Sequence, residues 1–109
     1  MRGEAYANLG DYRQAIKNYG KSTELDPKFA EAYFSLGFAY AKLGDYLQAI
    51  KNYTKAIDLG PKDSEAYFNR ATAYSKIGNH QQAIKDYKIA ARLGYKPAQG
   101  FLKSNRMSW

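Results

Sequence analysis

The residues Gly20-Lys21-Ser22-Thr23 look like the end of a phosphate-binding loop. Such a loop needs a further glycine five residues before Gly20 and a strand ahead of it, so that backbone N–H groups can cradle the phosphates. Ala15 occupies that glycine position, and the apolar residues around it follow a helical period. We therefore expect no nucleotide site in this segment.

His80 is the only histidine, and the chain has no cysteine. A catalytic histidine needs a nucleophile or a carboxylate beside it, and a metal ion needs several ligands. The sequence shows no such cluster, so we expect His80 to begin a helix and to pack across a turn. Asn52-Tyr53-Thr54 matches a glycosylation sequon, but it lies within a predicted helix in which Tyr53 is buried. We expect no catalytic residue, no metal site and no cofactor, and we do not expect an enzyme.

The segment from Ala30 to Pro61 predicts two amphipathic helices folded back on each other. Its first half has apolar or small residues at spacings of three and four, which form one face of a helix. Gly44-Asp45 predicts a turn, and a second such series follows it. Pro61 closes the segment because proline cannot continue a helix. The two series are Tyr33, Leu36, Gly37, Tyr40 and Leu43, and then Ala49, Ile50, Tyr53, Ala56 and Ile57.

The chain repeats this segment with a period of 34 residues. Residues 10–33 and 44–67 are identical at about two-thirds of their positions. A fixed period of this length, built from pairs of helices, indicates a solenoid, because neither helix of a pair can bury its apolar face alone. The predicted helices cover about residues 4–9, 11–25, 28–43, 46–59, 62–77, 80–93 and 97–104.

Ten positions of the second repeat form one register of small and large residues: Tyr33, Leu36, Gly37, Tyr40, Gly44, Tyr46, Ala49, Tyr53, Ala56 and Pro61. This register resembles the tetratricopeptide repeat (TPR) family. The resemblance implies an all-α, right-handed superhelical solenoid of antiparallel helix hairpins that ends in a C-terminal solvating helix. It also implies a single TPR domain. The parts of that domain are a truncated repeat over 1–27, repeats over 28–61 and 62–95, and a capping helix with a tail over 96–109.

The other two repeats depart from the register. Ala71 replaces the residue equivalent to Gly37, and Tyr95 stands where the inter-repeat proline would be. In the first repeat Arg2 occupies the position of Leu36, and the first helix lacks about one turn. We expect either a fragment of a longer protein or an end that another molecule completes.

The resemblance implies a protein–protein interaction module that binds a peptide or helix in a concave groove lined by the first helix of each repeat. Large apolar groups on such a surface indicate binding, and we expect Phe34, Phe38 and Phe68 to supply them. Lys42, Lys76 and Asn69 would orient the partner. The alternative is that the phenylalanines pack sideways between adjacent helices. The groove positions are Glu31, Phe34, Ser35, Phe38, Ala41 and Lys42, and then Glu65, Phe68, Asn69, Thr72, Ser75 and Lys76.

Some members of the family grip the C-terminal carboxylate of chaperone tails with lysine, asparagine and arginine. Asn69 matches the middle member of that clamp. Phe34 and Phe38 stand where the preceding lysine and asparagine should be, and Glu31 and Glu65 would repel a carboxylate. We therefore do not expect binding of chaperone tails.

Self-assembly is the alternative function. The truncated first repeat leaves apolar surface around Tyr6 and Leu9 uncovered, and a second copy of the chain would cover it. A homo-oligomer is the corresponding expectation.

Seventeen lysines and arginines against ten acidic residues give a net charge of +7. We assign most of the positive side chains to solvated outer faces of the second helices. An acidic partner is the main alternative, and we expect neither nucleic acid nor membrane as a partner. The absence of cysteine, of a long apolar run and of a signal-peptide pattern predicts a cytoplasmic protein, although a fragment would hide such a signal.

Overall fold

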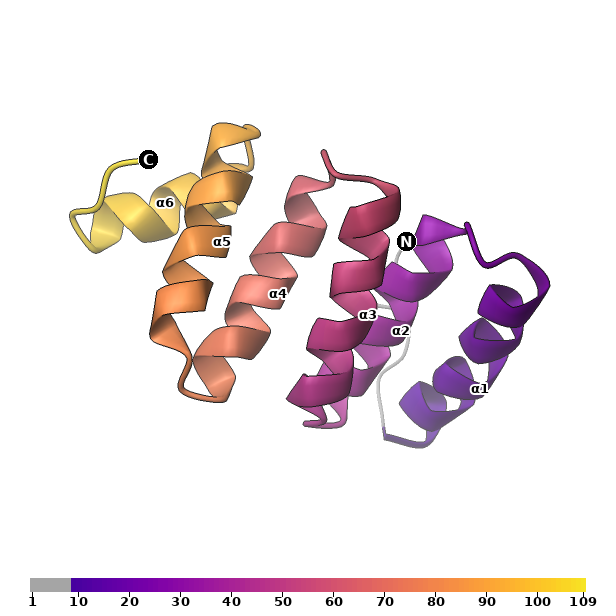
Figure 1. Ribbon diagram of the computed structural model, residues 1–109. Coiled ribbons are helices and arrows are strands. Elements are labelled where there is room, and N and C mark those ends of the chain that lie inside the picture. The colour runs from indigo at the N-terminus through magenta and orange to yellow at the C-terminus, as the bar shows by residue number, and fades with distance from the viewer. Residues whose placement is uncertain (1–8) are drawn as a thin grey trace. The chain divides into compact units, whose positions relative to one another are not determined.

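The computed structural model describes residues 9–109, and this part of the chain folds into six helices without a strand (Figure 1). It divides into two compact units, with the boundary between Pro61 and Lys62. This boundary is the junction of the predicted second and third repeats. The helices of the first unit are α1 (Leu9–Leu25), α2 (Ala30–Lys42) and α3 (Tyr46–Leu59). Those of the second are α4 (Ser64–Lys76), α5 (His80–Arg92) and α6 (Lys96–Ser104).

Short polar side chains begin three of these helices. The carboxylate of Asp45 accepts a hydrogen bond from the backbone N–H of Gln48, and Asp63 does the same for Ala66. The side-chain oxygen of Asn79 caps α5 in the same way. Each cap satisfies one of the N–H groups that the first turn of a helix leaves unpaired. Asp45 and Asn79 therefore fix where the second helix of the α2–α3 and α4–α5 hairpins starts, and Asp63 fixes the start of α4.

The turns before Asp45 and Asn79 each contain a glycine. Gly44 and Gly78 follow α2 and α4 with φ of +83° and +84°. This left-handed backbone is costly for residues that carry a Cβ, so glycine is favoured at both places. The repeat thus places a glycine and then a capping residue at the tip of each hairpin.

In the first unit, α2 packs against both α1 and α3. Tyr53 and Phe34 are two of the largest fully buried side chains, and their rings meet edge to face with centroids 5.6 Å apart. A Cβ on Gly37 would lie 2.7 Å from the Tyr53 ring, so the missing side chain permits the close approach of α2 and α3.

In the second unit, α5 packs against both α4 and α6. Its buried side consists mainly of small residues with Tyr87 between them, and Leu102 of α6 is fully buried in the same cluster. The chain after α6 also joins this cluster, because Met107 and Trp109 pack against it. Arg92 donates a hydrogen bond from Nε to the backbone oxygen of Trp109 at 3.2 Å.

The predicted helix ends are close to the observed ones for five of the helices, and α3 agrees at both ends. The prediction was wrong near Gly10. We expected one helix to end at Leu9 and another to begin at Asp11, but α1 begins at Leu9 and runs on through Gly10. The remainder of the predicted 4–9 helix lies outside the described residues.

Candidate protein-binding site

The face of α2 predicted to line a groove presents one aromatic ring and one cation. Phe38 is half-buried against the cluster around Tyr12, with the two ring centroids 6.4 Å apart. The exposed ammonium group of Lys42 lies 5.2 Å from the Phe38 ring centroid, within the range of a cation–π contact. Phe38 and Lys42 are therefore both accessible, and they lie next to each other on α2.

The predicted exposure of Phe34 was wrong. Its side chain is 1% exposed, because the ring lies against Tyr53 inside the α2–α3 pair. Ser35, another expected groove residue, is 2% exposed. Both residues belong to the interior of the protein, where a partner cannot reach them without a rearrangement.

The corresponding face of α4 has a more strongly packed aromatic ring. Phe68 is half-buried, and its ring lies 5.3 Å from that of Tyr87 and 5.1 Å from that of Tyr95. Thr72 is also engaged, because its hydroxyl donates to the backbone oxygen of Phe68 and lies 3.2 Å from the Tyr87 hydroxyl. Phe68 therefore contributes partly to the core of the second unit and partly to its surface.

Two polar residues on α4 complete this face. Asn69 is half-buried, and its amide has no hydrogen-bond partner within residues 9–109. Lys76 is exposed in the last turn of the helix. Glu65 lies in the first turn, as Glu31 does in α2, and each of these glutamates already interacts with another residue. An amide and a lysine are thus available to bind polar groups of a ligand.

Sequence reasoning missed an ion pair between α4 and α5. The guanidinium of Arg70 binds the carboxylate of Asp86 through Nε and Nη2 at 2.7 and 2.9 Å. The Arg70 side chain is 16% exposed and that of Asp86 is 5% exposed, and the guanidinium also lies over the rings of Tyr67 and Tyr74. The signal was present in the register, since opposite charges stand where the second repeat has Leu36 and Asn52.

The pKa of Arg70 reflects this environment. Burial lowers it, but the hydrogen bond to Asp86 and the charge of Asp86 raise it by more, so the net shift is upward. The guanidinium therefore stays charged at every ordinary pH. The ion pair is a structural contact inside the α4–α5 hairpin.

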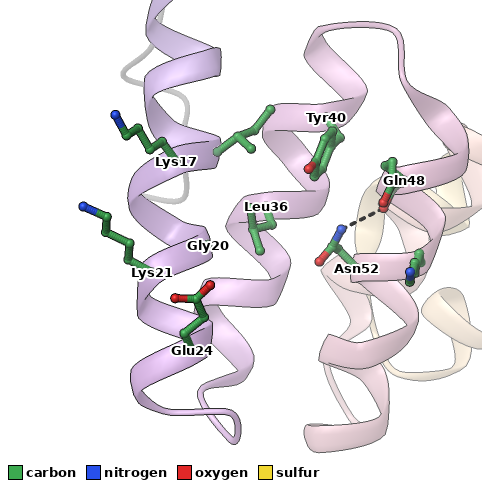
Figure 2. Close-up of a pocket in the computed structure, with 10 residues that line it drawn as sticks. Lys17, Gly20, Lys21, Glu24, Leu36, Tyr40, Gln48 and Asn52 are labelled. Carbon is green, nitrogen blue, oxygen red and sulfur yellow. Dashed lines mark hydrogen bonds between the residues drawn. The ribbon is translucent and has the colours of Figure 1, made fainter.

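The first unit contains a hollow of about 490 Å³ between α1, α2 and α3. Its base includes Leu36, and its walls include Gly20 and the amides of Gln48 and Asn52. Figure 2 shows the side chains of Lys17 and Lys21 on the side of α1 away from α2, so their charges do not converge on the hollow. The Asn52 amide is also engaged, since it donates to the backbone oxygen of Gln48 at 2.9 Å. We assign no ligand to this hollow.

The other sequence motifs lie in helices. In the Gly20–Thr23 motif, the hydroxyl of Thr23 donates to the backbone oxygen of Gly20 at 2.8 Å. The whole motif lies within α1, so it forms no phosphate loop. His80 is exposed at the start of α5. Tyr6, predicted for self-association, lies outside the described residues, and of Leu9 the structure gives only its place at the start of α1.

Residues 9–109 contain no group of three or more acidic or histidine side chains that could hold a metal ion. Over the same range, none of the helices has both the length and the apolar character needed to cross a bilayer.

Family models of the tetratricopeptide repeat match residues 3–44, 30–63 and 52–85. No curated protein matches the sequence. One similar solved structure is the second TPR of Spaghetti (RPAP3), bound to the HSP90 peptide SRMEEVD. It is 30% identical, the alignment covers 84% of this chain and 85% of that one, and the TM-score is 0.77.

A crystal structure of MamA is also 30% identical, with a TM-score of 0.73 over 82% of this chain. The chain spans about half the length of that protein, since the match covers 49% of it. The type III secretion translocator chaperone SycD of Yersinia enterocolitica shares the fold, with a TM-score of 0.82 at 20% identity. It is matched over 87% of this chain and 72% of its own length. From the repeat models and the 30% identity to a TPR of equal length, this chain belongs to the tetratricopeptide repeat family.

Proposed function

We propose that the α2 and α4 faces of this protein-interaction module each bind a segment of a partner protein. The observation that supports this proposal is the accessible set of side chains on those faces. Phe38 and Lys42 lie together on α2, and Asn69 and Lys76 lie on α4 beside the edge of Phe68. Lys42 and Lys76 occupy the same position of successive repeats. The two faces therefore present a related chemical pattern.

These residues define the kind of segment that would bind. The accessible parts of Phe38 and Phe68 favour an apolar side chain on the ligand. The Asn69 amide offers a donor and an acceptor, which suits the backbone of an extended peptide. Lys42 and Lys76 favour a ligand oxygen near the C-terminal end of each helix. Glu31 and Glu65 disfavour an acidic group at the opposite end.

A chaperone tail is not the ligand that we propose, although the RPAP3 repeat was solved with an HSP90 peptide. At the clamp positions expected from the family resemblance, this chain keeps only Asn69. It has Phe38 in place of an asparagine and carries glutamates where a lysine would hold the carboxylate. An internal peptide segment with an apolar side chain fits these residues better than a tail that ends in a C-terminal carboxylate.

The test begins with selection of binding peptides from a random phage-displayed library on the wild-type chain. The test variant combines Lys42→Ala, Asn69→Ala and Lys76→Ala, and it leaves the buried Phe34 and the packed Phe68 in place. We expect this variant to bind the selected peptides at least about tenfold more weakly, because it removes one contact from the α2 face and two from the α4 face.

The matched control combines Lys21→Ala, Lys51→Ala and Gln82→Ala, which are exposed positions on α1, α3 and α5. It should bind within about twofold of the wild type. Full affinity in the triple variant of α2 and α4 would refute the proposal.

A further inference from the structure

The outer helix of each repeat has three positions in the same register, and their charges differ. Each of α1 and α3 has one lysine and one carboxylate at these positions, so their charges cancel. In α5 all three side chains are positive. The positions are Lys17, Gly20 and Glu24 in α1, Lys51, Thr54 and Asp58 in α3, and Lys85, Lys88 and Arg92 in α5.

The excess of positive charge extends beyond α5 to other residues of the second unit. Six of the seven net positive charges of the chain lie in residues 62–109. Between residues 80 and 109 the only carboxylate side chain is that of Asp86, which is buried and bound to Arg70. No acidic side chain is therefore left to balance the cations on this surface. We call the following residues the basic face: Lys85, Lys88, Arg92, Lys96, Lys103 and Arg106.

The basic face follows the exposed sides of two packed helices. Lys85, Lys88 and Arg92 are spaced by three and four residues, so they lie on one side of α5 over about 10 Å. The opposite side of α5 is buried against α4 and α6. Lys96 and Lys103 are seven residues apart and exposed on α6. All members except the half-buried Lys88 are exposed.

This arrangement is unfavourable for the protein alone. Like charges three and four residues apart repel each other along a helix, and Lys88 and Arg92 of α5 stand where α3 carries Thr54 and Asp58. The same fold thus accepts an uncharged residue and an acid at these two positions, and α5 departs from that pattern. Carboxylates of a partner would offset the repulsion among these cations. Their attraction to the cations would also speed the association of the two proteins.

We infer that the basic face of the second unit is an interaction surface for an acidic segment of a partner protein. A single-stranded nucleic acid fits less well, because its bases need free aromatic rings on which to stack. Phe101, the exposed ring of α6, already lies against Tyr87 with centroids 4.2 Å apart. The surface is separate from the α4 residues of the proposed peptide site, so the inference does not depend on that proposal.

The experiment measures the fluorescence anisotropy of a labelled, end-blocked decaglutamate peptide at low salt. The first variant, Lys88→Thr with Arg92→Asp, installs the residues of the second repeat in α5. The second, Lys85→Glu with Lys103→Thr, retains the contact between Arg92 and Trp109. We expect each variant to bind the peptide at least about tenfold more weakly than the wild type.

The matched control is Lys21→Glu with Lys51→Thr in the first unit, which changes the net charge by the same amount. It should bind within about twofold of the wild type. The Lys42, Asn69 and Lys76 triple alanine variant should also retain binding. Equal loss in the control and in the α5 variants would show attraction by net charge alone and would overturn the inference. Tighter binding of single-stranded DNA of equal charge, lost in the α5 variants, would assign the surface to nucleic acid instead.

Discussion

The α2–α3 and α4–α5 hairpins have the same register but different interiors. Where α2 and α3 carry Leu36 and Asn52, α4 and α5 carry the ion pair of Arg70 and Asp86. Gly37 allows a close approach in the first hairpin, whereas the second has a fully buried Ala71 at that position. The helix pairing of the repeat therefore accepts either a leucine and an asparagine or a buried ion pair at these two positions.

Replacing the two equivalent phenylalanines should reveal the largest difference in stability between the two hairpins. Phe34→Ala should lower the free energy of unfolding by about 4 kcal/mol, because the ring is fully buried against Tyr53. Phe68→Ala should cost about 2 kcal/mol, since its ring is only half-buried. Urea denaturation followed by circular dichroism measures both values. Equal losses would contradict the assignment of Phe34 to the core and of Phe68 partly to the surface.

Breaking the ion pair should have the next largest effect. Arg70→Leu alone should cost about 3 kcal/mol, because it leaves the charge of Asp86 buried without its partner. Adding Asp86→Asn installs the Leu36 and Asn52 pair of the second repeat and should restore most of that loss. The measurement is the urea midpoint of the two variants. If the double variant is no more stable than the single one, the two interiors are not interchangeable.

Gly37→Ala should destabilise the first hairpin by about 2 kcal/mol. The added Cβ would lie 2.7 Å from the Tyr53 ring and 3.1 Å from the Ala49 oxygen, so the helices must move apart. The matched change in the second hairpin, Ala71→Gly, should cost about 2 kcal/mol through helix propensity and the loss of a buried methyl group. A thermal melt that finds Gly37→Ala neutral would disprove the close approach.

The smallest expected effect is a gain in stability when Gly20 is replaced. A Cβ there would meet nothing within 4 Å, and the residue lies inside α1, so Gly20→Ala should stabilise the protein by about 1 kcal/mol. Gly44→Ala is the control. It should destabilise by about 1 kcal/mol, because its φ of +83° suits glycine only. Denaturant midpoints that move in the same direction for both variants would contradict this difference.

The sequence predicted the fold well because the signals were redundant. The period of 34 residues, the apolar register and the turn at Gly44-Asp45 all pointed to the same hairpin. The break predicted at Gly10 was wrong because glycine occurs both in turns and inside helices, and Gly10 is helical. The repeat register alone could not separate these two cases.

The site was harder to predict. The repeat register tells on which side of a helix a residue lies, but it does not tell how much of its side chain is exposed. Phe34 and Phe68 occupy the same position, yet one is fully buried and the other half-buried. The ion pair was missed for a related reason. Arg70 and Asp86 are far apart in sequence, and each would pass for a solvated charge until the α4–α5 pairing is taken into account.

The central claim is that a partner binds the first helix of each hairpin. The most direct measurement is an NMR titration of the ¹⁵N-labelled chain with a selected peptide, with the backbone amide shifts mapped onto the sequence. We expect the largest shifts around Phe38 and Lys42 of α2 and around Asn69, Thr72 and Lys76 of α4. Shifts confined to the outer sides of α3 and α5 would contradict it.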